Sequence, residues 1–523
     1  MLARQSRDDG KTHVDGRGAP STRPKARPLD HAPAPPPTRQ PSEAIESAIE
    51  EFKSQGVDLT GIYTGTGLQS HAVFTLSSQL QAHIDKKDVV SVGLSLESLL
   101  EEVQKEDEEV ATAVLLAAET MHAFAPGVVA LQGPSATTTC AAFLAVYAKL
   151  LLLSNTLREA FRGSPEADNV GAVRSLLAHE DTLVRCGALA VAGSLAVQDE
   201  AGKTIVMSMD PHEHIVGVLE ATRGSDGDTF GRGVEAATAL IVPLASADDT
   251  TQPSSSAFAN ARKLAQSGVS AALVESLRVL WNEAEKDNEN ANEIGNKRVA
   301  TVTCQLCTGI KLLAANDEIC KELVQELALL DLLFVVLKSS LADDVSAGVM
   351  ASAMALLRQM MASDHVKHAL HTAAFISIAS NNLQMYIDET YAPAADPGNK
   401  VLEHTLGAVS ALCLRNPEAS ESVVDSGCAQ LIISAMQVAI DRKDAETTVA
   451  TVATGAPAPA PAPPVGKPLR QGCMAVRNIA SRSPHVREVL RSYEAVRVIE
   501  NCKVAAKSAC TDVGDAAIRD VTN

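Results

Sequence analysis

The chain has 523 residues, of which 46% are hydrophobic and only 3% are aromatic. This composition favours helices packed through Ala, Leu and Val over β-sandwiches, whose strands use aromatic and β-branched residues. The formal net charge of −19 means that the body of the chain would repel phosphate backbones, so we expect no nucleic acid partner.

The beginning of the chain differs in composition from the rest. Residues 1–42 are rich in Pro, Arg and Gly and contain few apolar residues, so we predict a disordered tail. Residues 43–75 are predicted to form a short helix and a linker that contains the sequence QGVDL. From residue 76 to residue 523 the pattern is helical throughout, and we assign this range to a repeat solenoid.

A short polar junction recurs along the solenoid region, where it ends one apolar helix and begins the next. Its markers are Asn155, Asp199, Asp248, Asp317, Asp364, Pro417 and Pro484. Four of the six intervals between them measure 44 to 53 residues, near the armadillo and HEAT period of about 40–47. The two longer intervals contain insertions at 282–296 and 443–467, which we place between the second and third helices of their units.

A unit of three helices explains these intervals better than a unit of two. Residues 401–440 illustrate the pattern, because Asn416 and Pro417 break one apolar helix and Gly427 ends the short helix that follows. The sequence therefore predicts an all-α fold, an armadillo-type α-α superhelical solenoid of about seven three-helix repeats. We expect the last repeat to be a truncated cap at 484–520.

Several blocks of the chain resemble the armadillo repeat-containing protein 6 family. The most specific is EFKSQGVDLTGI at 51–62, which is similar to the block that precedes the repeats of that family. GCMAVRNIA at 472–480, DHVKHAL at 364–370 and ALCLRNPE at 411–418 are similar in register. The resemblance implies a non-enzymatic armadillo protein.

The sequence contains few candidates for chemistry. His212 and His214, beside Asp210, would present two imidazoles to a metal ion or a modifying enzyme only if the segment is a helix-entry turn, and a solvated helix start is the alternative. Cys304 and Cys307 lie in the middle of an apolar helix, where buried structural thiols explain them. No hydrolase, metalloprotease or phosphate-loop motif occurs, so we expect no enzyme activity and no cofactor.

Polar residues on the third helices indicate a binding surface. In the last long helix the buried stripe is Leu469, Cys473, Val476 and Ala480, which leaves the opposite face for contacts in a concave groove. The candidates on that face are Arg470, Met474, Arg477 and Asn478. Further candidates on third helices are Arg185, Arg232, Lys297, Lys311, Arg358 and His404, although many such residues are only solvated.

These observations favour a protein-binding scaffold that holds an extended or helical partner segment in the groove. The alternative is a transport adaptor or chaperone-like cofactor that recognises basic client segments, steered by the acidic body. A Trp-x-x-x-Asn ladder is missing, which argues against importin-like recognition of basic signals. Ten scattered cysteines predict free thiols in a reducing compartment, the cytoplasm or alternatively the nucleus. No apolar run of 18 residues occurs, so we expect no membrane partner. We also expect a monomer.

Overall fold

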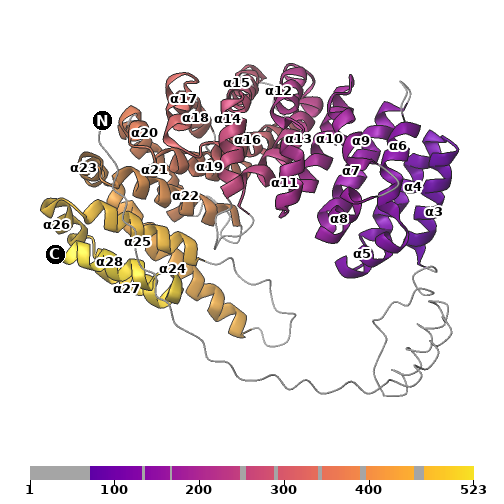
Figure 1. The fold of residues 1–523 in the computed structure, drawn as a ribbon. Helices are drawn as coiled ribbons and strands as arrows, with labels where there is room; N and C mark the ends of the chain where they lie inside the picture. Colours follow the sequence, from indigo (N-terminus) through magenta and orange to yellow (C-terminus); the bar gives the residue numbers. More distant parts are fainter. Residues whose placement is uncertain are drawn as a thin grey trace, which may run out of the picture. The chain divides into compact units, whose positions relative to one another are not determined.

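The structure is a computed structural model, and most of the predicted solenoid region can be described in it (Figure 1). The described residues are 71–131, 136–164, 168–247, 255–287, 293–339, 344–370, 372–388, 396–452 and 465–523. The predicted tail at 1–42 and the predicted short helix that follows it lie outside these ranges. The first described helix, α3 (Ala72–Asp85), begins four residues before the predicted start of the solenoid.

The third helices of successive units form one continuous stack. Each packs against the next, from the N-terminal end of the described chain to its C-terminal end. The members are α4 (Val89–Val103), α7 (Thr137–Leu153), α10 (Thr182–Ala196), α13 (Gly227–Ala245), α16 (Glu293–Leu313), α19 (Asp344–Met360), α22 (Asp396–Cys413), α25 (Gly466–Ala480) and α28 (Thr511–Thr522).

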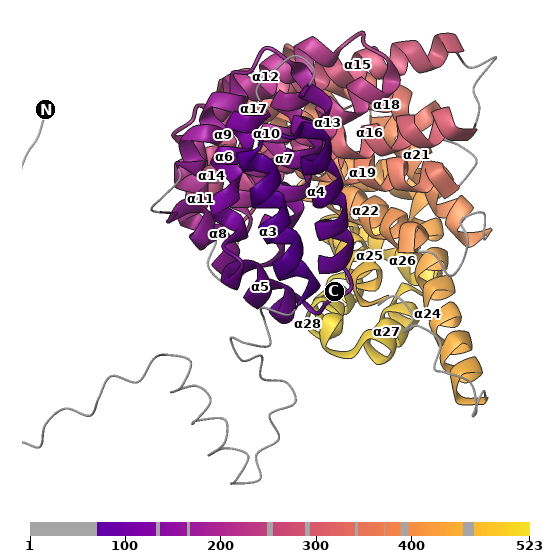
Figure 2. The ribbon, with the colours of Figure 1, turned by 90° about the vertical axis from the view of Figure 1, so that its right-hand side faces the viewer.

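The first and second helices of the units flank this stack (Figure 2). The first helices are α5 (Glu108–Ala117), α8 (Asn155–Arg162), α11 (Glu200–Met207), α14 (Ser255–Gln266), α17 (Asp317–Gln325), α20 (Asp364–Ala369), α23 (Pro417–Asp425) and α26 (Pro484–Ser492). The second helices are α6 (Phe124–Ala130), α9 (Asn169–Leu177), α12 (Pro211–Thr222), α15 (Val269–Asp287), α18 (Leu329–Ser339), α21 (Thr372–Ile387), α24 (Cys428–Val452) and α27 (Ala495–Ala506).

Two short 3₁₀ helices, η1 (Thr120–Ala123) and η2 (Lys507–Ala509), complete the described elements, all of which are helical. The prediction of an all-α armadillo-type solenoid is therefore confirmed. Eight three-helix units follow α3 and α4 in the described residues, close to the seven expected. The last unit is complete rather than a truncated cap, because α26, α27 and α28 pack together as first, second and third helices.

The recurring junctions are the N-terminal caps of the first helices. Ser154, Asp199, Asn316 and Asn416 each accept a hydrogen bond from a backbone N–H in the first turn of the helix that they begin. Such a cap satisfies a donor that has no partner inside the helix. Each cap follows directly on the end of a third helix, so the polar junction marks the repeat boundary for a physical reason.

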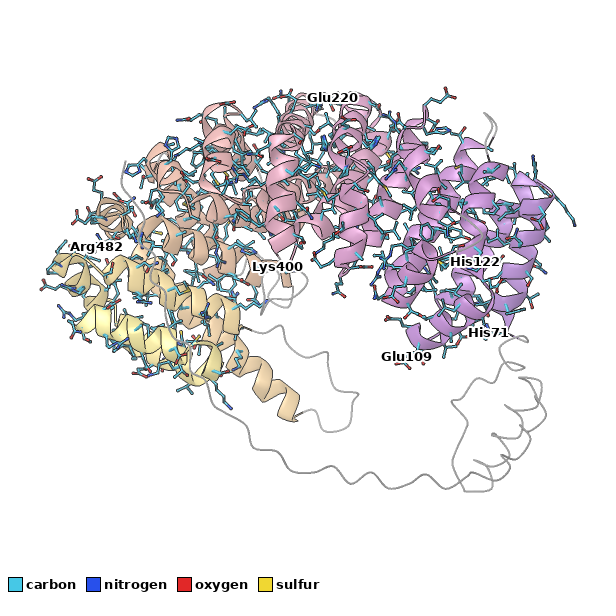
Figure 3. The ribbon with its side chains drawn as sticks, viewed as in Figure 1. His71, Glu109, His122, Glu220, Lys400 and Arg482 are labelled. Atoms are coloured by element: carbon cyan, nitrogen blue, oxygen red, sulfur yellow. The ribbon has the colours of Figure 1, made fainter. Side chains whose placement is uncertain are left out.

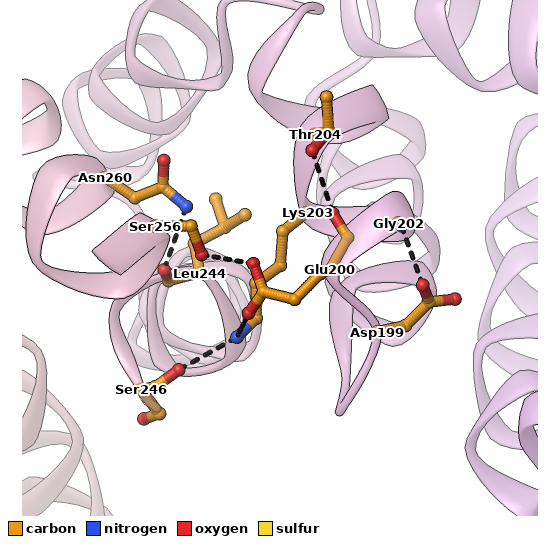
Figure 4. A network of polar contacts seen from close by, with 9 residues as sticks. All are labelled: Asp199, Glu200, Gly202, Lys203, Thr204, Leu244, Ser246, Ser256 and Asn260. Atoms are coloured by element: carbon orange, nitrogen blue, oxygen red, sulfur yellow. Dashed lines mark hydrogen bonds and ion pairs between the residues drawn. The ribbon is translucent and has the colours of Figure 1, made fainter. Parts of the chain in front are cut away.

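Buried lysines connect the first helix of a unit to the end of its third helix. Lys203 of α11 is 1% exposed, and its Nζ lies 3.0 Å from Glu200 and donates to the carbonyl oxygen of Ser246 just after α13 (Figure 4). Lys367 of α20 pairs with Asp364 in the same way and donates to the carbonyl oxygen of Leu414 after α22. A cation at a helix C-terminus compensates the partial negative charge of the last carbonyls.

Close approach of the third helices depends on glycine. A Cβ atom at Gly187 of α10 would lie 2.8 Å from the Cβ atom of Leu144 in α7, and one at Gly193 would overlap the carbonyl oxygen of Ala239 in α13. Glycine thus lets α10 pack closely against both of its neighbours. Any side chain at Gly193 would push against backbone, which cannot move away as a flexible side chain can.

The two predicted insertions lie between second and third helices, but they are partly helical. Helix α15 continues to Asp287 and α16 begins at Glu293, so much of the segment 282–296 extends these helices. Helix α24 continues to Val452 before α25 begins at Gly466. In the apolar first part of α24, Ile432 is buried, whereas Leu431 beside it is only partly buried.

Within the described ranges, no single helix has the length and hydropathy needed to cross a membrane. Two bent pairs, α5 with η1 and α6, and α23 with the first part of α24, satisfy the requirement on length and composition alone.

We predict that Gly193→Ala lowers the free energy of unfolding by about 1–3 kcal/mol, because its methyl group would press on the backbone of α13. Gly231→Ala is the matched control inside α13, where the new methyl group would lie 3.7 Å from Val302 and meet only ordinary contact. The control should raise stability by about 0.5–1 kcal/mol through helix propensity. Urea unfolding followed by circular dichroism measures both, and equal effects would contradict the close-packing argument.

Candidate functional site

A pocket of about 240 Å³ opens where α16, α19 and α22 lie side by side on the third-helix stack. Small side chains of α19 at spacings of three and four line it, namely Gly348, Ala351, Ser352 and Ala355. These residues recur along one side of a single helix, so they leave room that larger side chains would fill. The remaining lining residues are Cys304, Thr308 and Lys311 of α16 and Lys400 and His404 of α22.

The pocket is surrounded by cations. Lys311 and Lys400 belong to its lining, and Arg358 lies directly beside it on α19. None of the residues that line it is an acidic residue. In the described part of the chain, neither Lys311 nor Arg358 makes an ion pair or a side-chain hydrogen bond. In Figure 3, Lys400 lies on the side of the helical stack away from Glu220 of α12.

Arg358 is positioned by a glycine on the next third helix. A Cβ atom at Gly407 of α22 would lie 2.8 Å from both Cδ and Nε of Arg358. The absence of a side chain at Gly407 therefore lets the guanidinium lie across α22, one turn from His404. Three repeats thereby contribute to one cluster of positive charge.

His404 is the titratable group at the centre of this cluster. Its pKa is lowered to about 4, first by burial and then by the positive charges of Arg358, Lys311, Lys400 and Lys467. Its Nδ1 atom is buried and has no hydrogen-bond partner. At neutral pH the imidazole is therefore neutral, with an unused polar atom next to a pocket that has an excess of positive charge.

The four predicted groove residues of α25 divide into two pairs. Arg470 is exposed and its Nη1 lies 3.8 Å from the sulfur of Met474, one turn along the helix. Arg477 pairs with Asp520 of α28 at 3.2 Å. Asn478 donates through Nδ2 to the backbone oxygen and to Oγ of Ser410 in α22, both at 2.9 Å. The second pair thus connects neighbouring third helices, and the amide donors of Asn478 are already occupied.

Arg185 lies apart from the other groove candidates. Its Nη2 donates to Thr182 at 3.0 Å, and its Nη1 would lie 3.5 Å from a Cβ atom at Gly217 of α12. Burial and the positive charge of Arg185 both lower the pKa of His214, which Glu213 beside it partly offsets. The structure therefore brings Arg185 to the histidine segment rather than to the basic pocket.

His212 and His214 both lie in the first turns of α12, which begins at Pro211. Residues two positions apart on a helix point in different directions, so the condition for two converging imidazoles is not met. Among the described residues, no group of three His, Cys, Asp or Glu side chains has the geometry to hold a metal ion. Asp210 instead approaches Lys263 of α14 at 3.7 Å.

Cys304 lines the basic pocket, whereas Cys307 is fully buried in the core. Burial raises the pKa of both thiols. A thiol with a raised pKa is a poor nucleophile and a poor metal ligand, so the interpretation as structural cysteines agrees with the geometry.

Sequence reasoning selected Lys311, Arg358 and His404 separately and missed Lys400 and Lys467. A signal for both was present, because Lys400 precedes His404 by four residues and Lys467 precedes Arg470 by three. These are spacings that place two side chains on one face of a helix. The charge of Lys467 acts on His404 from α25, so the cluster extends over four third helices.

Comparisons with known proteins found structural likeness at low sequence identity. An engineered protein of known crystal structure is 14% identical with a TM-score of 0.49, and the match covers 89% of this chain and 97% of that one. A designed armadillo repeat protein is 14% identical with a TM-score of 0.39, covering 59% and 100%. Another, in complex with the peptide (KR)4, has a TM-score of 0.38 at 14% identity, covering 59% and 99%.

A scan against models of protein families gave no match, and a search of curated proteins gave none. The assignment of an armadillo-type fold therefore depends on the three-helix stacking observed in this chain.

We predict that His404 makes the stability of the protein depend on pH. Its pKa is about 4 in the folded state and near 6.5 in an unfolded chain, so stability is full above pH 6.5 and is lost as the pH falls toward 4. His404→Gln should reduce this loss between pH 7 and pH 5 by on the order of 1 kcal/mol, allowing for solvent screening at a half-buried site. Urea unfolding at both pH values tests this, and identical losses in the two proteins would contradict it.

Proposed function

We propose that the chain is a non-enzymatic scaffold that binds an extended or helical segment of a protein partner along its third helices. The observation that carries this proposal is the pocket between α16, α19 and α22, with its small residues and with Lys311 and Arg358, which make no ion pair within the described chain. Concave sites with a few convergent polar groups are where ligands bind. A stacked solenoid presents such positions in a row, which suits a partner that runs along the stack.

The charge of the pocket bears on the alternative function, a transport adaptor or chaperone-like cofactor for basic client segments. The net charge of the chain is −19 and would attract a basic client from a distance. The pocket itself carries Lys311 and Lys400, with Arg358 beside it, and would repel a basic side chain at contact. This part of the surface therefore favours the scaffold over the basic-client adaptor.

The residues of the pocket favour binding over catalysis. His404 is neutral and has no acidic residue among the pocket-lining groups that would orient it as a base. Burial raises the pKa of Cys304, which is the nearest thiol, so it is not activated as a nucleophile. Lys311 and Arg358 act at this site as donors to a bound anion.

Membership in the armadillo repeat-containing protein 6 family is part of the proposal. Three of the similar blocks fall in described helices of the repeats. Block 364–370 covers α20, block 411–418 spans the boundary between α22 and α23, and block 472–480 lies in α25. Block 51–62 lies outside the described residues.

The proposal places the protein in the cytoplasm, with the nucleus as the alternative, and takes it to be a monomer. All ten cysteines are free thiols and nine of them are buried. Free thiols in such number suit a reducing compartment.

We predict that filling the pocket abolishes partner binding without unfolding the protein. Ser352→Trp places a large ring among the small residues of α19, and Ser422→Trp on the exposed side of α23 is the matched control. In affinity purification from cells, partners recovered with the wild type and the control should fall about tenfold or more with Ser352→Trp.

As a control, circular dichroism and thermal melting should show that the wild type and both variants are folded alike. If Ser352→Trp melts early, the double variant Lys311→Glu and Arg358→Glu replaces it, because neither side chain is buried in the core. An unchanged set of partners for both folded variants would refute binding at this surface.

A further inference from the structure

The distribution of charge at the pocket is opposite to that of the whole chain. The chain has 64 acidic and 45 basic residues, so a random surface site would more often be acidic. Around His404, however, four basic side chains converge from four helices: Lys311, Arg358, Lys400 and Lys467. Like charges repel, so a negative ligand beside Lys311 and Arg358, which have no ion-pair partner in the described chain, would relieve this repulsion.

We propose that this pocket binds the carboxylate of an acidic partner segment and that His404 takes up a proton when the carboxylate binds. This inference rests on the proposed function, because it names the chemistry of the segment that the scaffold holds.

Geometry favours a single acidic side chain over a larger ligand. A volume of about 240 Å³ is below the roughly 300–1,000 Å³ of typical small-molecule sites, so the pocket suits one side chain of a peptide. Lys311 and Lys400 reach it from opposite helices, and Arg358 lies across α22 beside it. The described lining offers cationic side chains but no helix N-terminus, which is the common backbone element of phosphate sites.

The charge of the whole chain selects a short acidic peptide against a nucleic acid. A long polyanion would bring many phosphates near the acidic body, whose repulsion grows with each of them. A segment with one or two carboxylates can place them at the pocket and keep the rest of its length neutral. An acidic residue within an otherwise uncharged partner segment is therefore the occupant that we expect.

His404 couples this binding to protons. Four charged groups lower its pKa, namely Lys311 of α16, Arg358 of α19, Lys400 of its own helix and Lys467 of α25, and the other titratable group of the pocket lining is Cys304. Each of these four charges opposes a proton on the imidazole. A bound carboxylate would offset them and would accept a hydrogen bond from the protonated ring, so it would raise the pKa of His404.

By linkage, a ligand that raises the pKa binds more tightly as the pH falls. If the carboxylate restores the pKa of His404 from about 4 to the ordinary histidine value of 6.5, affinity increases about tenfold between pH 7.5 and pH 5.5. The carboxylate of a glutamate peptide stays ionised over this range, since its own pKa is about 4.3.

The test measures fluorescence anisotropy of a labelled nine-residue peptide of serine and glycine, with blocked termini and one central glutamate, mixed with the full chain at pH 7.5 and 5.5. We expect binding by the wild type that is about tenfold tighter at pH 5.5. Lys311→Gln with Arg358→Gln should weaken it at least about tenfold at both pH values. Lys86→Gln with Lys338→Gln removes the same charge from exposed positions just after α3 and on α18 and should leave binding unchanged. His404→Gln should bind the peptide but lose the pH dependence.

Four outcomes would overturn the assignment. These are equal binding by the pocket and control variants, a pH dependence that survives His404→Gln, tighter binding of the same peptide with lysine in place of glutamate, and stronger pocket-dependent binding of oligouridylate or of a phosphopeptide. The Ser352→Trp variant separates this inference from the proposed function. If partners are lost with Ser352→Trp but the glutamate peptide fails to bind the wild type, the scaffold stands and the anion site is refuted. If the glutamate peptide binds at the pocket but no partner depends on Ser352, the anion site stands and the proposed function is refuted.

Discussion

The packing of each third helix against the third helices before and after it is the constraint on which the molecule depends. A single three-helix unit leaves apolar faces exposed, and only its neighbours can bury them. The stack is continuous from α4 to α28, and glycine at Gly187 and Gly193 lets α10 lie close to both neighbours. Buried lysines such as Lys203 then fix the first helix of a unit to the end of the third.

This stacking converts distance along the sequence into proximity. Lys311, Arg358 and His404 are each about one repeat apart in sequence, and the stack places them around one pocket because they occupy similar positions on adjacent helices. Asn478 and Arg477 show the other outcome of the same geometry. Their side chains contact Ser410 and Asp520 on neighbouring third helices and so connect adjacent repeats.

Net charge and local charge act on different aspects of recognition. The acidic body sets the long-range field, which is screened over about 8–10 Å at physiological salt. The pocket sets the contact interaction, and there the sign is positive. The total charge of the chain therefore favours the approach of basic clients, whereas the charge of the pocket favours contact with acidic segments. In our proposal the contact interaction determines which segment binds.

The sequence by itself determined the helical class, the three-helix period and the repeat boundaries, because these depend on local signals such as the cap at Asn416 and the turn at Gly427. It also selected Lys311, Arg358 and His404, but not the Lys400 and Lys467 that accompany them at the pocket. Only the tertiary structure decided which of them meet. Arg185 lies near His214, Asn478 is hydrogen-bonded to Ser410, and Lys400 lines the pocket. The neighbours of a side chain in other repeats depend on how each helix is rotated in the stack. Helical periodicity within one segment does not specify that rotation.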